Sequence, residues 1–157
     1  MASAPIRRHP ALQPVSKEHH TGLMLCFQVR KGVKEGIDHA RLSAYITWFA
    51  AEHLEPHFRF EENVLLPLLP ADDPMNLRII SEHAALRAFF GRTDWNAGLL
   101  VSFADLLDQH IRFEERVWFN FLQEHCDESV LQKVLVQHDA TSSCGVWSDP
   151  FWLEFKR

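Results

Sequence analysis

The sequence predicts an all-α fold: an up-down-up-down four-helix bundle with a short C-terminal helix and tail. Apolar residues recur at helical spacing in four long segments, and short stretches containing Gly, Pro or Asp separate them. No segment shows the alternating pattern of a β-strand. The chain has 157 residues, of which 46% are hydrophobic and 24% charged, as expected for one globular domain.

The first helix is expected to follow an extended N-terminal arm. Residues 1–15 contain three prolines and little periodicity, and Ser16 is in position to cap a helix. Apolar residues at helical spacing lead from there to Lys31, whose charge suits a helix C-terminus. Gly32 and Gly36 are expected to end this helix.

The second helix is expected to begin after Asp38, a good N-cap residue, and to end at Pro67. Pro56 lies inside this segment. Proline removes one backbone donor and clashes with the preceding turn, so a kink is expected over residues 52–56.

The remaining helices have clear boundaries. Asp73 and Pro74 form a cap and first-turn pair for the third helix, which Gly91 ends. The fourth helix is expected to begin within 93–96 and to run to about residue 125, and a shorter one to span 127–138. Residues 16–140 therefore form the predicted bundle. Residues 141–157 form a tail too aromatic to be free in solvent, so it is expected to pack on the bundle.

An internal repeat links the second and fourth helices. The segment HFRFEENV at 57–64 matches HIRFEERV at 110–117, with the same His, Arg, Phe, two Glu and Val at each equivalent position. Packing against a common core explains a shared apolar pattern. It does not require the same histidine and glutamate at the same phase.

The spacing places each histidine and glutamate of the repeat on one helix face. His57 and Glu61 are four residues apart, as are His110 and Glu114. The following Phe and Val of each repeat, at 60 and 64 and at 113 and 117, share roughly that face, so the pairs are expected to point inward. A buried carboxylate is costly unless it is paired or bound to a cation.

The first and third helices each add a histidine near their start. His83 stands three residues before the core residue Leu86. In the first helix His20 has this phase relative to Leu23, whereas His19 follows a glutamate, as His83 does. We choose His20 because a ligand must face the core, and His19 remains the alternative.

The predicted metal ligands are His20, His57, Glu61, His83, His110 and Glu114. Imidazoles and carboxylates without a thiolate suit iron, manganese or zinc, and two carboxylates able to bridge suit a pair of ions. With two histidines on each metal and both glutamates shared, coordination positions stay open for a small ligand.

The order His, His-x-x-x-Glu, His, His-x-x-x-Glu on successive helices resembles the hemerythrin-like, or HHE cation-binding, domains. The resemblance covers roughly residues 15–125 and implies a non-heme centre of two iron ions in the bundle core. Oxygen, peroxide or another small ligand would then be the partner. Oxygen-carrying hemerythrins have a His-x-x-x-His pair on the third helix, and here Arg87 stands at its second position. Metal binding is therefore implied more strongly than reversible oxygen carriage.

Three functions fit these residues. The first is a di-iron protein that binds or senses oxygen or iron through a centre of four histidines and two glutamates. The alternative is a di-iron oxidase or peroxidase-like enzyme acting on oxygen or peroxide. The third has no metal and treats the same residues as a hydrogen-bonded polar core, which would require a protein partner for every polar group.

Several other polar residues are expected to have supporting roles. His53 aligns with a packing position of the repeat and is interpreted as a packing residue or one that orients a ligand. Glu62 and Glu115 are expected to pair with arginines or to hydrogen-bond the ligands. The remaining histidines are expected near solvent or at helix ends: His9, His39, His125 and His138.

The composition also limits the classes of partner that the protein is expected to bind and its expected location. The net charge of −5 disfavours nucleic acid, and no segment has the roughly 20 apolar residues of a membrane span. The three cysteines form no C-x-x-C pair, so neither a disulfide framework nor a thiolate metal site is predicted. A cytoplasmic protein is expected.

Overall fold

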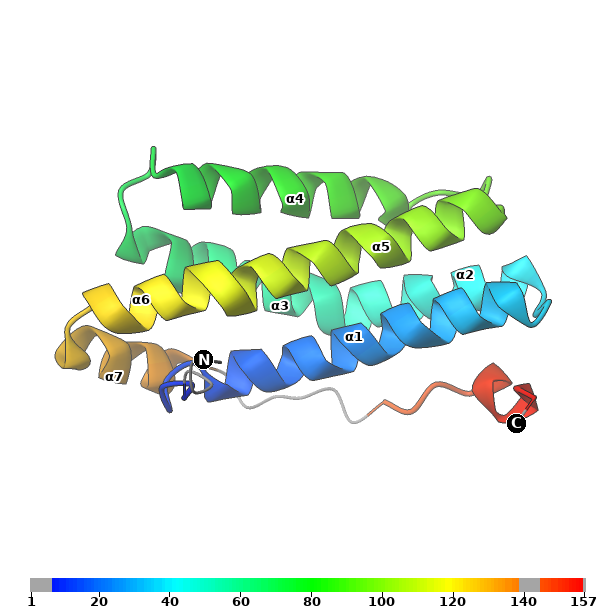
Figure 1. The fold of residues 1–157 in the computed structure, drawn as a ribbon, viewed down its shortest axis with the longest axis horizontal. Coiled ribbons are helices and arrows are strands. Elements are labelled where there is room, and N and C mark those ends of the chain that lie inside the picture. Colours follow the sequence, from blue (N-terminus) through cyan, green and yellow to red (C-terminus); the bar gives the residue numbers. More distant parts are fainter. Residues whose placement is uncertain (1–6, 139–144, 157) are drawn as a thin grey trace, which may run out of the picture.

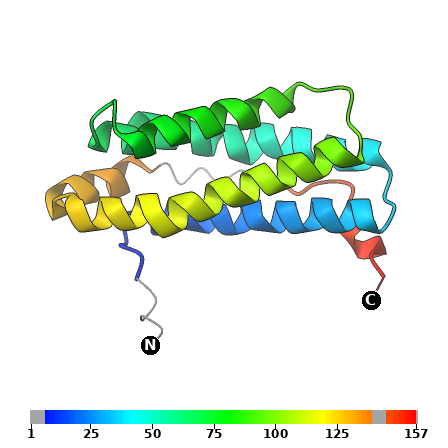
Figure 2. The ribbon, with the colours of Figure 1, turned by 45° about the horizontal axis from the view of Figure 1, so that its top comes forward.

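A computed structural model of the chain describes residues 7–138 and 145–156, and within these ranges every regular element is helical. Four long helical rods lie side by side along the long axis of the molecule (Figures 1 and 2). The prediction of an all-helical bundle is confirmed. No helix in the described part of the chain is long and apolar enough to cross a membrane.

The first and third rods are single α-helices, whereas the second and fourth contain short π-helical turns. The first rod is α1 (Gln13–Lys34), and the third is α4 (Pro74–Phe90). The second contains α2 (His39–Phe49), η1 (Ala50–Leu54), α3 (Glu55–Phe60), η2 (Glu61–Leu65) and η3 (Leu66–Leu68). The fourth contains α5 (Ala97–Phe113), η4 (Glu114–Trp118) and α6 (Phe119–His125). The shorter α7 (Glu128–Gln137) and η5 (Phe151–Glu154) follow.

The first rod begins four residues earlier than the sequence suggested, because its N-cap is Leu12 and not Ser16. Pro14 lies in the first turn of α1, where its missing N–H leaves no hydrogen bond unmade. Ser16 is therefore inside the helix instead of capping it, and its hydroxyl donates to the carboxylate of Glu115 on the fourth rod. Residues 1–6 of the expected arm lie outside the described residues.

Only one of the two glycines expected to end the first helix does so. Gly36 has φ of +75°, and the N–H of Ile37 donates to the carbonyl of Gly32. Gly32 itself is buried within α1, and a Cβ there would lie 2.6 Å from Cδ2 of Leu42. The glycine thus permits close contact between α1 and α2.

The expected disturbance near Pro56 takes the form of a π turn. The element η1 immediately precedes the α3 turn that holds Pro56, and the N–H of Glu55 donates to the carbonyl of Ala50, five residues earlier. The wider turn accommodates the proline without ending the rod.

Side-chain caps are present at the starts of the second, third and fourth rods. Asp38 accepts a hydrogen bond from the N–H of Ala40. Asp73 accepts a hydrogen bond from the N–H of Met75, and Asn96 accepts one from Leu99. The described part of the C-terminal tail packs back on the bundle through Phe151, which is fully buried and contacts Tyr45 with ring centroids 5.4 Å apart. Residues 139–140 of the expected bundle and residues 141–144 and 157 of the expected tail lie outside the described residues.

The apolar core is divided into two clusters. One contains Leu25, Phe58, Leu86 and Ile111, and the other contains Val15, Leu65, Ile79 and Trp118. Each rod contributes to both clusters, and between these positions in the sequence each rod carries buried histidine or glutamate side chains. A polar layer therefore separates two apolar ones.

Candidate metal centre

Six buried side chains from all four rods converge in this polar layer. They form two overlapping groups of possible metal ligands, in each of which the ligand atoms lie within 4.8 Å of one another. The first group is His19, His57, Glu61 and Glu114, and the second is Glu61, His83, His110 and Glu114. Both glutamates belong to both groups, so they occupy the middle of the arrangement.

The first-helix histidine in this cluster is His19, not the His20 that was chosen from the sequence. The side chain of His19 is 3% exposed, whereas His20 is exposed on the outside of α1. Leu23, the core reference for His20, is only half-buried, whereas Gly22, Leu25 and Cys26 are buried. A glycine at an inward position was the missing signal, because it contributes no side chain to an apolar pattern.

Gly22 is at that inward position because α1 and α5 approach closely. A Cβ added to it would lie 2.8 Å from Cδ1 of Ile111. The other predicted ligand residues, His57, Glu61, His83, His110 and Glu114, all lie in the cluster.

Both glutamates begin a π turn, at the same phase of the repeat. Glu61 is the first residue of η2 and Glu114 the first of η4. The wider turn changes which following residue faces inward. Val117 is 45% exposed, whereas Trp118 is fully buried, and Leu65 is buried while Val64 is only half-buried. The inward-facing residue expected at positions 64 and 117 is therefore found one residue later, at Leu65 and Trp118.

The Nε2 atoms of the four histidines face the two central carboxylates. The distance from Nε2 to the nearest glutamate oxygen is 3.2 Å for His57 and for His83, both to Glu61. It is 2.8 Å for His19 and 3.4 Å for His110, both to Glu114. Four imidazole nitrogens and two carboxylates thus border one central volume.

A second set of carboxylates lies behind the histidines. The Nδ1 atoms of His83 and His110 lie 2.8 Å from Glu62 and Glu82, respectively. Those of His57 and His19 lie 3.4 Å from Glu18 and Glu115. In each case the carboxylate comes from a neighbouring rod, so these outer contacts connect the first rod to the second, the second to the third, the third to the fourth and the fourth to the first.

The outer carboxylates determine which imidazole nitrogen can bind a metal. A carboxylate only accepts hydrogen bonds, so the outer carboxylates beside His57, His83 and His110 favour a proton on Nδ1 of these rings. In the neutral ring Nε2 then has a free lone pair, directed at the central volume. Carboxylate, histidine and metal in this order are the usual arrangement of a histidine ligand and its supporting acceptor.

The central charges strongly shift the pKa values. Burial alone would lower the pKa of His19, but its contacts with Glu114 and Glu115 outweigh this and raise it to about 9. Burial alone would raise the pKa of Glu114, but His110, His19 and His57 hold it well below its usual range. A cation at the centre would supply the same compensation in place of protons.

Hydrogen bonds between protein groups do not satisfy the cluster. Within the described residues, neither oxygen of Glu61, nor Nε2 of His83 or His110, nor Oε2 of Glu114 has a hydrogen-bond partner. All are buried, and buried polar atoms are rarely left unpaired. The donor set fits a cation and argues against the metal-free polar core.

Several residues near the centre have supporting contacts. The guanidinium of Arg87 pairs with Glu62 at 2.7 Å and with Glu55 at 3.0 Å, so it holds the outer carboxylate of His83 from the far side. The ring of His53 lies against Phe49 at 4.7 Å and belongs to neither ligand group. The prediction that the repeated second glutamates support the ligands agrees with these contacts.

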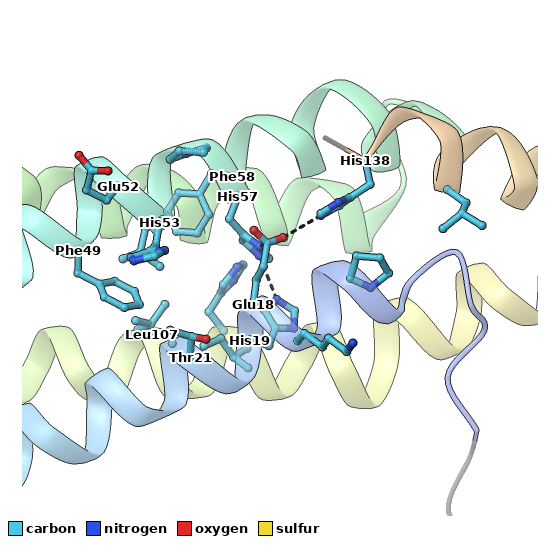
Figure 3. A pocket seen from close by; sticks show the side chains of 18 residues that line it. Glu18, His19, Thr21, Phe49, Glu52, His53, His57, Phe58, Leu107 and His138 are labelled. Carbon is cyan, nitrogen blue, oxygen red and sulfur yellow. Dashed lines mark hydrogen bonds and ion pairs between the residues drawn. The ribbon is translucent and has the colours of Figure 1, made fainter. Parts of the chain in front are cut away.

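A cavity of about 790 Å³ reaches the cluster from one side. Its wall includes His19, His57 and His110, and further along Phe49, His53 and Leu107 (Figure 3). Near the histidines, Glu18 contacts both His57 and His138, the latter at 3.1 Å. The cluster is thus connected to a space much larger than a water molecule.

Comparison with known families agrees with this arrangement. A sequence model described as the hemerythrin HHE cation binding domain matches residues 11–122, more than half of the chain. No curated protein and no solved structure shows significant similarity to the chain.

Proposed function

The chain belongs to the hemerythrin HHE cation-binding family, and on this basis we propose that it binds two iron ions and uses them to bind or sense oxygen or iron. The proposed ligands are His19 and His57 for one ion and His83 and His110 for the other, with Glu61 and Glu114 shared. The proposal keeps the up-down-up-down order and the cytoplasmic location expected from the sequence.

The observation that carries the proposal is the sharing of two carboxylates by two groups of histidines. A single ion would leave one pair of imidazoles without a metal, whereas two ions use every nitrogen and oxygen donor in the layer. Neutral imidazole and carboxylate donors suit iron, and manganese or zinc are the substitutes with similar preferences.

The protein side chains prepare the site before a metal arrives. Three outer glutamates, Glu18, Glu62 and Glu82, orient the imidazoles that they contact and hold their protons on Nδ1, and apolar layers flank the site on both sides. When bound, a pair of iron ions with open positions supplies reversible binding or activation of oxygen or peroxide.

Metal analysis tests the proposal. Protein purified without oxygen is analysed for metals by plasma mass spectrometry, and its optical spectrum is recorded before and after exposure to air. About two irons per chain and a new near-ultraviolet band after exposure are expected. A folded protein that binds neither iron nor manganese or zinc when these are supplied would reject the proposal.

The second candidate is an oxidase or peroxidase-like enzyme. The observation that favours it is the cavity beside the cluster, because a carrier of a diatomic molecule does not need a space of about 790 Å³. Iron-loaded protein is mixed with a reductant and either oxygen or peroxide. Consumption over many turnovers supports the enzyme, whereas consumption that stops at one equivalent per centre supports a carrier or sensor.

A further inference from the structure

The cavity differs from the metal centre in its chemistry and its position. It lies between α1, the η1 and α3 region of the second rod, α5 and α7. Its volume of about 790 Å³ is within the range of sites that bury a small organic molecule, whereas one water in the liquid occupies about 30 Å³. Oxygen or peroxide alone would leave most of it unused.

The wall of the cavity is mainly apolar beyond the histidines. Phe49, Leu54, Phe58, Leu107 and Ile111 all line it, and each is at most 5% exposed. Such a wall favours an apolar body, because burying apolar surface is favourable and burying an unpaired charge is costly.

Two histidines in the wall, His53 and His138, belong to neither ligand group, and His138 is paired with Glu18. His53 is packed against Phe49 and Trp48, and its ring nitrogens have no hydrogen bond to a described side chain or backbone group. Burial lowers its pKa, so the neutral ring, which both donates and accepts, predominates near neutral pH. In Figure 3 His53 and Leu107 lie at one end of the site, on the opposite side of His57 from His138.

The charges at the wall argue against an anionic ligand. The carboxylates of Glu18 and Glu52 line the cavity, and Lys17 is the only lysine or arginine among its described lining residues. Apart from the cluster histidines, which a metal would occupy, a carboxylate or phosphate group entering this space would meet two carboxylates and one ammonium group. The combination of apolar wall, neutral histidine and acidic side chains fits an uncharged molecule with one hydrogen-bonding group.

The cavity does not approach the two halves of the centre equally. Both histidines of one ligand group, His19 and His57, lie in its wall. Of the two histidines in the other group, His110 lies in the described lining and His83 does not. A molecule in the cavity would therefore lie beside the metal position formed by His19 and His57.

We propose that this cavity binds a neutral, mainly apolar organic molecule with a single hydroxyl or similar polar group, next to the metal position of His19 and His57. The inference rests on the proposed function, because it names the class of compound that would meet the centre. The polar group of the bound molecule is expected to form a hydrogen bond with the ring of His53.

The test uses 2-naphthol as a neutral probe and 2-naphthoate as the anion of matched shape. Binding to the full chain is measured by calorimetry in metal-free, zinc-loaded and manganese-loaded protein. The zinc and manganese samples are also compared by proton NMR of the probe. We expect 2-naphthol to bind at least tenfold more tightly than 2-naphthoate, and its resonances to broaden with paramagnetic manganese but not with zinc.

Variants locate the probe. Leu107→Trp fills the cavity and is expected to abolish binding, whereas Leu77→Trp, on the exposed face of α4, leaves it unchanged. If Leu107→Trp does not fold, His53→Phe keeps an aromatic ring but removes the hydrogen-bonding group, and it should weaken 2-naphthol binding about fivefold.

The outcomes separate this inference from the proposed function. Protein that binds two metals but not 2-naphthol overturns the inference alone, as do equal binding of 2-naphthoate or equal line widths with manganese and zinc. Protein that binds 2-naphthol in a Leu107-dependent manner but takes up no metal overturns the proposed function while supporting the cavity assignment.

Discussion

The carboxylate of Glu82 lies 2.8 Å from Nδ1 of His110, on the side of the imidazole that faces away from the central glutamates. This contact joins the third rod to the fourth. It holds the ring so that Nε2 is directed at Glu114.

The Glu82 contact predicts a loss of metal affinity without a loss of ligand atoms. Glu82→Gln removes the charge behind His110 while keeping the size of the side chain, and metal affinity should fall by about 10 to 100-fold. Competition with a chelator of known affinity measures the change. Glu124→Gln, on an exposed residue of α6, is the matched control, and an equal effect of both substitutions would contradict the role given to Glu82.

The adjacent histidines of α1 provide a sharp test of ligand identity. His19→Ala removes a buried nitrogen from the cluster and should reduce the metal content by at least one ion per chain, whereas His20→Ala changes an exposed side chain and should leave it at the wild-type value. Metal analysis of the two purified variants decides between them. Loss of metal in the His20 variant alone would restore the choice made from the sequence.

The central glutamates should matter more than any single histidine. Because Glu61 belongs to both ligand groups, Glu61→Ala should abolish binding of both ions. His83→Ala removes a ligand of one group only, so one ion should remain. Titration with zinc, followed by calorimetry, gives the number of sites in each variant, and two retained sites in Glu61→Ala would show that this carboxylate is not shared.

Metal binding should stabilise the fold. The buried glutamates and histidines leave unpaired polar atoms in the described structure, and a cation that binds only the folded chain shifts unfolding by mass action. At a free metal concentration of about 100 times Kd, the expected gain is about 2.7 kcal/mol. Thermal unfolding with zinc and with a chelator measures it. Identical midpoints, with zinc shown to be bound in the folded sample, would contradict the coupling.

The tail should detach in acid. Arg41 lowers the pKa of Asp149 and Glu154, both of which it contacts. A carboxylate with a lowered folded-state pKa contributes stability above its unfolded value, and this contribution is lost as pH falls through the folded value. Fluorescence of the tryptophans around Tyr45 should therefore change as pH falls below about 4, which is near the ordinary carboxyl pKa.

A matched pair of arginine substitutions tests the origin of this acid transition. Arg41→Gln should produce the detached spectrum already at neutral pH, whereas Arg92→Gln breaks an exposed pair with Asp94 and should not. An unchanged spectrum in Arg41→Gln would show that aromatic packing alone holds the tail.

The rods and most residues of the cluster could be predicted because they depend on local periodicity and on the repeat. Asp73 and Asn96 act as caps through their own side chains, and the repeated His and Glu kept their phase on both helices. The π turns could not be predicted in the same way. A turn with one additional residue depends on packing around Glu61 and Glu114, and no residue type in the sequence marks it.

The preceding glutamate was the sequence feature that favoured His19 over His20. A glutamate precedes both His19 and His83, and the structure gives this pairing a physical meaning. Glu18 contacts the histidine of the second rod and Glu82 that of the fourth, while the adjacent histidine turns into the cluster. Two neighbours on a helix point in different directions, so one can be a ligand while the other supports a ligand on the next rod.

These contacts have the same pattern in both halves of the chain. Glu18, His19, His57, Glu61 and Glu62 correspond in role to Glu82, His83, His110, Glu114 and Glu115. A hairpin of two helices that met a second copy of itself across a twofold axis would complete the whole set. The centre therefore has an internal twofold correspondence, in which each half of the chain supplies one full set of inner and outer side chains.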